Sequence, residues 1–104
     1  MSDIALLHCT FPDRAEAERV AEAVVAERLA ACVNILAPCR SIYRWQGAIE
    51  RADEVPALFK TMPALAERPR KRIEALHSYD LPAVETWPVA ARAALSGWVE
   101  AETD

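Results

Sequence analysis

Glycine is scarce in this chain of 104 residues, which contains only Gly47 and Gly97. Loops that cradle phosphate groups depend on closely spaced glycines, so this scarcity argues against a nucleotide-binding loop. No apolar run approaches the roughly 18 residues that a membrane span requires. Residues 4–7 are also too short an apolar run for a secretory signal. The sequence therefore predicts a cytoplasmic protein without a membrane partner.

Basic residues are fewer than acidic ones: the chain has 12 Lys and Arg and 16 Asp and Glu, which gives a net charge of −4. Nucleic-acid binding depends on basic patches, so no nucleic-acid partner is expected. The three cysteines, Cys9, Cys32 and Cys39, cannot all pair within one chain and are expected to be reduced thiols. Because no Cys-x-x-Cys pair and no order of nucleophile, base and orienting residue is present, no enzymatic activity is predicted.

The hydrophobic content of 53% is sufficient for a single domain that covers residues 1–104. At this size, folding buries roughly two thirds of the surface of the unfolded chain, which leaves little margin of stability. Association into an oligomer would be a natural way to increase this margin of stability.

The hydrophobic period changes along the chain in a definite order. It predicts a strand, a helix, a long strand, a hairpin partner, a second helix, a fourth strand and a terminal helix, over residues 4–10, 12–29, 32–45, 48–61, 63–77, 83–89 and 91–102. Pro38 predicts a bend or bulge in the long strand, and Gly47 supplies the hairpin turn. In the terminal helix, Leu95, Trp98 and Val99 are expected to face inward.

This order is the split βαβ arrangement, so we predict an α+β fold, a ferredoxin-like βαββαβ sandwich with an extended central hairpin and a C-terminal helix. The first two helices are expected on one face of the antiparallel sheet. A long hairpin exposes unpaired strand edges, which is a liability unless another chain pairs with them.

Residues 28–49 carry the most specific motif. A helix end of small residues runs into Cys32-Val33-Asn34, and the strand Ser41-Ile42-Tyr43-Arg44-Trp45 turns at Gly47. Further matching positions are Thr10, Pro12, Lys60, Thr61, His77, Tyr79, Pro82 and Trp98. Over almost its whole length the chain resembles the CutA family of divalent-cation (copper) tolerance proteins. The resemblance implies a homotrimer in which the central hairpins meet at the subunit boundaries.

Several residues depart from the family pattern. Pro56 has no amide hydrogen to donate, so we expect the returning strand to break or bulge there. Pro69 predicts that the second helix begins at this residue, with residues 64–68 forming a separate turn. Ser78 replaces the proline that commonly follows the histidine, which leaves the local geometry around His77 open.

Cys9 and His77 are the candidate metal ligands. In some members of the resembling family the equivalent residues are described as copper ligands, together with a second histidine whose position is Leu76 here. Thiolate and imidazole suit copper, with zinc or other divalent cations as alternatives. Taken alone, Cys9 is more typical of a small core residue than of a ligand, and His77 also fits as a cation at a helix terminus. His8 would point to the opposite face of the strand from Cys9.

The resemblance also implies a cleft between subunits, bordered by Tyr43, Trp45, Glu54, Lys60 and Tyr79. Tyr43 and Trp45 would otherwise be core or interface aromatics, since each ring buries a large area and carries one polar atom. Lys60 would otherwise be a simple salt-bridge partner.

We therefore expect a non-catalytic homotrimer that binds copper or related metal ions and contributes to metal tolerance. Two alternatives remain. One is a sensor similar to the trimeric PII proteins, which binds a small effector at the subunit cleft, and the other is a structural scaffold. The tight turn at Gln46-Gly47 argues against the long mobile loop that a PII-like sensor needs.

Overall fold

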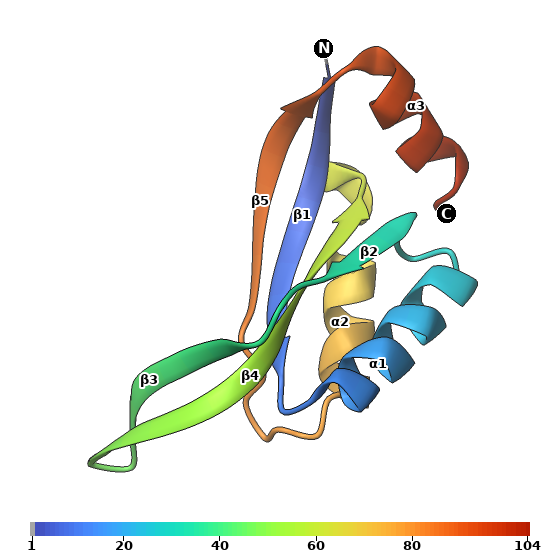
Figure 1. The fold of residues 1–104 in the computed structure, drawn as a ribbon. Coiled ribbons are helices and arrows are strands. Elements are labelled where there is room, and N and C mark those ends of the chain that lie inside the picture. The colour runs from blue at the N-terminus through green and yellow to red at the C-terminus, as the bar shows by residue number, and fades with distance from the viewer. Residues whose placement is uncertain (1) are drawn as a thin grey trace.

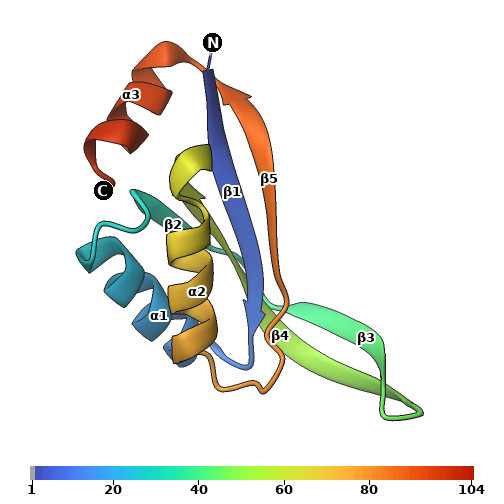
Figure 2. The same cartoon turned by 180° about the vertical axis from the view of Figure 1, so that it is seen from behind.

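The computed structural model describes residues 2–104, which form a twisted five-stranded antiparallel sheet with helices packed against it (Figure 1). The strands are β1 Ser2–Phe11, β2 Cys32–Ile35, β3 Cys39–Trp45, β4 Ala48–Thr61 and β5 Val84–Ala91. The helices are α1 Arg14–Ala26, α2 Glu67–Leu76 and α3 Ala93–Ala101, with a short 3-10 turn at Pro63–Leu65. In the view from behind, α1 and α2 lie side by side along the sheet (Figure 2).

The strand order is β2-β4-β1-β5, and β3 pairs with the first half of β4. Every neighbouring pair is antiparallel. This arrangement confirms the predicted ferredoxin-like fold with an extended central hairpin and a C-terminal helix. The hairpin of β3 and β4 projects from the body of the molecule, and it lengthens the chain to 45 × 24 × 23 Å.

Alternate residues of β1 face the helices. Leu7, Cys9 and Phe11 are fully buried, and they pair with Phe59, Ala57 and Val55 of β4 on the same face. Helices α1 and α2 cover this face with Ala17, Val20, Val24 and Ile73. A second, smaller cluster of Ile4, Ala91 and Val99 attaches α3 to the other end of β1. The two clusters leave the hairpin outside the core.

The predicted interruption of the long strand is confirmed and separates β2 from β3. Between the pairs Ile35–Ala57 and Cys39–Glu54, residues 36–38 lie opposite residues 55–56 only, which is a bulge. The break or bulge predicted at Pro56 is this bulge in the pairing with β2 and β3, whereas β4 itself runs through Pro56 and keeps its register with β1. The Pro56 carbonyl accepts from the Leu36 N–H at 2.9 Å, so the missing amide hydrogen faces the bulge rather than β1.

Helix α1 ends at Ala26, three residues before the predicted end at Leu29. Arg28 has a φ of +61°, and the N–H groups of Arg28 and Leu29 donate to the carbonyls of Val25 and Val24. This is a Schellman motif, in which the left-handed position is usually glycine. The Arg28 side chain instead binds the C-terminal segment, at 3.1 Å from Asp104 Oδ2 and 2.8 Å from the Ala101 carbonyl.

The second half of the chain differs from the prediction at two places. Helix α2 begins at Glu67, so Pro69 is its third residue and still lies in the first turn, where no helical partner is needed for its nitrogen. In α3 only Val99 of the three predicted inward residues is buried, and Leu95 and Trp98 are exposed. Ser96 takes the inward position one turn before Val99, so the buried stripe is displaced by one residue.

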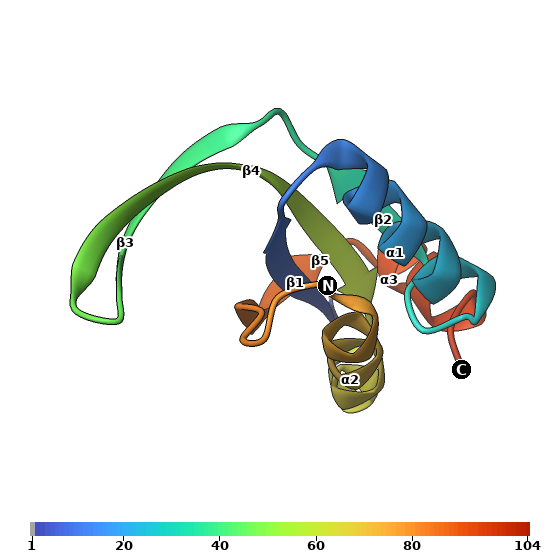
Figure 3. The ribbon, with the colours of Figure 1, turned by 90° about the horizontal axis from the view of Figure 1, so that it is seen from below.

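The hairpin arches away from the helices, and its concave side faces the segment between α2 and β5 (Figure 3). In the described part of the chain no helix is long and apolar enough to cross a membrane. The three cysteines are free thiols.

Candidate functional site

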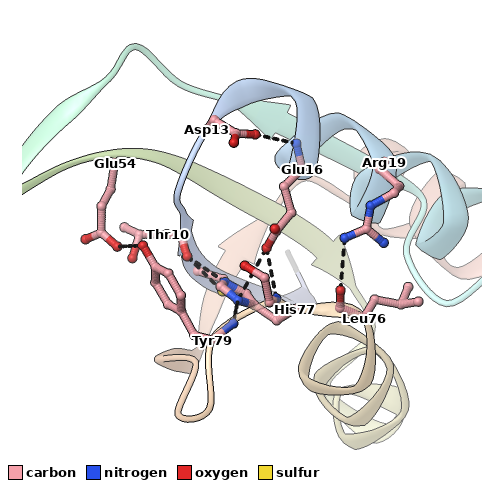
Figure 4. A network of polar contacts seen from close by, with 10 residues as sticks. Thr10, Asp13, Glu16, Arg19, Glu54, Leu76, His77 and Tyr79 are labelled. Carbon is pink, nitrogen blue, oxygen red and sulfur yellow. Dashed lines mark hydrogen bonds and ion pairs between the residues drawn. The ribbon is translucent and has the colours of Figure 1, made fainter.

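The predicted residue His77 lies where the end of β1, the start of α1 and the end of α2 meet (Figure 4). Asp13 caps α1, since its Oδ1 accepts from the Glu16 N–H at 2.8 Å. Glu16 occupies the position at which a capping-box glutamate normally bonds back to the cap. Here its Oε2 accepts from the Ser78 N–H at 3.1 Å, which attaches the chain after α2 to the start of α1.

Both ring nitrogens of His77 are occupied. Nε2 lies 2.8 Å from the Thr10 carbonyl, and Nδ1 accepts from the Tyr79 N–H at 3.1 Å. Because a carbonyl only accepts and a backbone N–H only donates, these contacts select the neutral tautomer with the proton on Nε2. The buried ring also stacks on Phe11 with its centroid 4.7 Å away. Glu16 Oε2 is 3.5 Å from Nδ1.

Cys9 is completely buried in the core below this site. Burial, assisted by the negative charges of Glu85 and Glu54, raises the pKa of the Cys9 thiol to about 12. The protonated thiol donates weakly to the Thr10 carbonyl at 3.6 Å. Cys9 and His77 therefore converge on the same carbonyl oxygen, but each already has a hydrogen-bond partner.

These contacts set a condition on the predicted metal site at Cys9 and His77. Coordination requires a thiolate and a free imidazole nitrogen. As folded, the pair offers neither, so it does not form a ready-made site, and the metal site stays a prediction. Among residues 2–104, no group of three or more His, Cys, Asp or Glu side chains is arranged to hold a metal ion.

A pocket of about 470 Å³ lies next to this network, beneath the arch of the hairpin. Its lining residues are Thr10, Ser41, Tyr43, Trp45, Glu54, Tyr79, Asp80, Leu81 and Ala83. The Tyr79 hydroxyl donates to Glu54 Oε2 at 2.8 Å across one side of the pocket (Figure 4). Partial burial, and then the hydrogen bond to the Glu54 carboxylate, raise the pKa of the Tyr79 hydroxyl.

The structure brings four of the five predicted cleft residues to this pocket, namely Tyr43, Trp45, Glu54 and Tyr79. Lys60 is six residues further along β4 than Glu54, roughly 20 Å away at the rise of a strand, and does not line the pocket. Within the subunit, Tyr43 and Trp45 are exposed rather than core residues.

Sequence reasoning did not identify Glu16, Ser41, Asp80 or Leu81 as residues of the site or the pocket. The spacing of Asp13 and Glu16 is a capping-box signal for Glu16, although the pattern cannot show that its carboxylate turns to Ser78. Asp80 and Leu81 belong to a loop that carries no periodic pattern, so no local signal marks them.

Comparison with known proteins gives a consistent result. Residues 5–102 match the family model described as CutA1 divalent ion tolerance protein. The divalent-cation tolerance protein CutA of Thermus thermophilus is 40% identical over 90 residues, which cover 86% of this chain and 85% of that protein. The protein of the same name from Pyrococcus horikoshii is 44% identical over 79 residues, which cover 76% of each.

Solved structures of similar proteins share the fold. The Thermus thermophilus structure superposes with a TM-score of 0.92 at 35% identity, covering 97% of this chain and 99% of that chain. The CutA structure from Archaeoglobus fulgidus, which is described as periplasmic, has a TM-score of 0.93 at 31% identity and covers 97% of this chain and 99% of its own.

Proposed function

Because the chain belongs to the CutA1 divalent ion tolerance protein family, we propose that it is a non-catalytic cytoplasmic homotrimer that binds copper or related divalent ions and contributes to their tolerance. The observation that carries the proposal is the family match over residues 5–102, which runs from within β1 to the end of α3. The relatives are named for divalent-cation tolerance.

The chemistry of the site supports a role without catalysis. A nucleophilic cysteine needs a lowered pKa and an adjacent free base. Cys9 has a raised pKa, and both nitrogens of His77 are held by backbone groups. The pair therefore lacks an activated nucleophile.

The exposed apolar surface supports assembly. Ile42 and Ile49, on the hairpin, are 64% and 57% exposed, and Trp87 on β5 is also exposed. Within residues 2–104, β3 pairs only with β4, and β5 pairs only with β1, so each keeps one free edge. Strand edges and apolar side chains of this kind are typical of surfaces that another subunit covers.

We propose Cys9 and His77 as the metal donors, and the contacts around them determine how they would bind. The Cys9 thiol must lose a proton whose pKa is raised, and His77 must release one of its two hydrogen bonds. Binding is then weak, and it strengthens with rising pH because the metal competes with protons. A reducing compartment keeps the thiol available.

Calorimetric titration of the reduced protein with copper(I) and zinc tests this proposal. About one ion per subunit is expected, with water completing the coordination. Cys9→Ser and His77→Ala should each weaken binding, whereas the matched variants Cys39→Ser and His8→Ala, which change the same residue types elsewhere, should not. Equal binding by all four variants would place the metal elsewhere. In sedimentation, a monomer at micromolar concentration, rather than a species of roughly three times 11.5 kDa, would refute the trimer.

A further inference from the structure

The central hairpin, residues 39–54, separates its side chains by type between its two faces. Directly paired residues of an antiparallel ladder share a face, so the register of β3 with β4 assigns them. One face, which we call the aromatic face, carries Cys39, Ser41, Tyr43, Trp45, Ala48, Glu50, Ala52 and Glu54. The other carries Arg40, Ile42, Arg44, Ile49, Arg51 and Asp53. All the arginines of the hairpin thus lie opposite the aromatic face.

The aromatic face forms one wall of the 470 Å³ pocket, and residues 79–83 form the other. Figure 3 shows the hairpin arching over the side on which this segment lies. Two carboxylates, Glu54 and Asp80, line the pocket together with the rings of Tyr43, Trp45 and Tyr79. Of the described residues, no Lys, Arg or His side chain is part of the lining. The pocket is therefore acidic and rich in aromatic surface.

Glu54 points to a positively charged ligand. It is only 7% exposed, and the Tyr79 hydroxyl is its one side-chain hydrogen-bond partner within residues 2–104. No Lys or Arg of this part of the chain pairs with it. A buried carboxylate without a counter-charge is unfavourable, so a cation in the pocket would lower its free energy.

We propose that this pocket binds an organic ammonium ion, whose charge is neutralised by Glu54 and Asp80 and whose alkyl groups contact the rings of Tyr43 and Trp45. Aromatic faces attract alkylated ammonium groups through their quadrupoles, whereas hard metal ions require a shell of oxygen ligands. The volume is that of a site for an organic molecule rather than a bare ion. The lining residues all belong to one chain and include neither Cys9 nor His77, so the proposal does not rest on metal binding.

Choline is a suitable probe, and 3,3-dimethylbutan-1-ol, its uncharged analogue of the same shape, is the matched control. Both are titrated into the assembled protein in phosphate buffer, which contains no organic amine, and the indole N–H resonance of Trp45 is followed by NMR. We expect choline to bind with a Kd of roughly 1 mM and the alcohol about tenfold more weakly. Added salt should weaken the binding of choline only.

Variants on the two faces of the hairpin separate a specific site from general electrostatic attraction. Glu54→Gln keeps the shape of the side chain and an acceptor for Tyr79, and should weaken choline binding about tenfold by calorimetry. Asp53→Asn removes the same charge from the opposite face at the next residue, and should leave the affinity unchanged. Trp45→Leu should weaken binding about fivefold, whereas Trp45→Phe keeps a ring and should bind nearly as the parent does.

Three results would overturn the proposal. These are equal affinities for choline and the alcohol, equal effects of Glu54→Gln and Asp53→Asn, and no shift of the Trp45 resonance at about 50 mM choline. The first and third need only the parent protein, so they do not depend on whether a variant folds.

Discussion

Replacing His77 by Phe should separate the hydrogen bonds of this buried ring from its packing. Phe has a similar size and can keep the stack on Phe11, but it leaves the Thr10 carbonyl and the Tyr79 N–H without their partner. Tyr79 is exposed, so its N–H can turn to water at a loss of about 1 kcal/mol. The half-buried Thr10 carbonyl keeps only the weak Cys9 thiol contact and should lose about 1–2 kcal/mol.

The expected destabilisation by His77→Phe is therefore about 2–3 kcal/mol, measured by urea unfolding at pH 7 and a fixed protein concentration. His77→Ala also removes the ring and should cost more, about 4 kcal/mol in all. His8 is the matched control, because within residues 2–104 its partly exposed ring bonds only to Glu85, at 3.0 Å, and His8→Phe should cost less than about 1 kcal/mol.

Two outcomes would refute this reasoning. If His77→Phe unfolds at the same urea concentration as the parent, the two hydrogen bonds contribute nothing and His77 acts through packing alone. If His77→Ala is no less stable than His77→Phe, the stack on Phe11 contributes nothing.

The thiol of Cys9 predicts a dependence of stability on pH. Its pKa rises from 9.0 to about 12 on folding, so the unfolded chain loses this proton first, and the free energy of unfolding should fall between these pH values by about 1.4 kcal/mol per pH unit. Urea unfolding of Cys9→Ala should lack this component, and the exposed Cys39→Ala should keep it; identical slopes in all three proteins would contradict the assignment. At the left-handed position of Arg28, Arg28→Gly should be more stable than Arg28→Ala by about 1 kcal/mol, because both lose the side-chain contact to Asp104 and only glycine adopts this conformation without strain. A thermal or urea series in which the alanine variant is equal or better would show that residue 28 is not strained.

Local pattern was sufficient for the order and type of the main elements. Alternation and helical spacing predicted the ferredoxin-like order, and Pro38 predicted the interruption between β2 and β3. The predictions fail where contacts with a segment distant in the sequence determine the local structure. The predicted bulge at Pro56 affects only the pairing with β2 and β3, because the missing amide hydrogen faces Leu36, and that alignment depends on the register of two strands.

The ends of helices and their buried faces also depend on contacts that the local sequence pattern does not contain. Helix α1 ends before Leu29 because Arg28 is held in a left-handed conformation by a Schellman motif and by contacts to the C-terminal residues. In α3, the spacing of Leu95, Trp98 and Val99 fits one helical face, but the rotation of the helix on β1 buries Ser96 and Val99 instead. The periodicity of the sequence predicts an apolar face for the helix, but the orientation of the helix on the sheet determines which residues are buried.

For the candidate site, the residue types were predictable and their chemical state was not. The sequence by itself determined the family resemblance, the candidates Cys9 and His77, and the aromatic and acidic residues of the hairpin, because each depends on identity and short spacing. Only the tertiary structure decided that Cys9 is sealed in the core, that both nitrogens of His77 are occupied, and that Glu54 meets Tyr79 at a pocket. Burial and hydrogen bonding are set by segments far apart in the chain, and they control which side chains are charged and which atoms are free to bind.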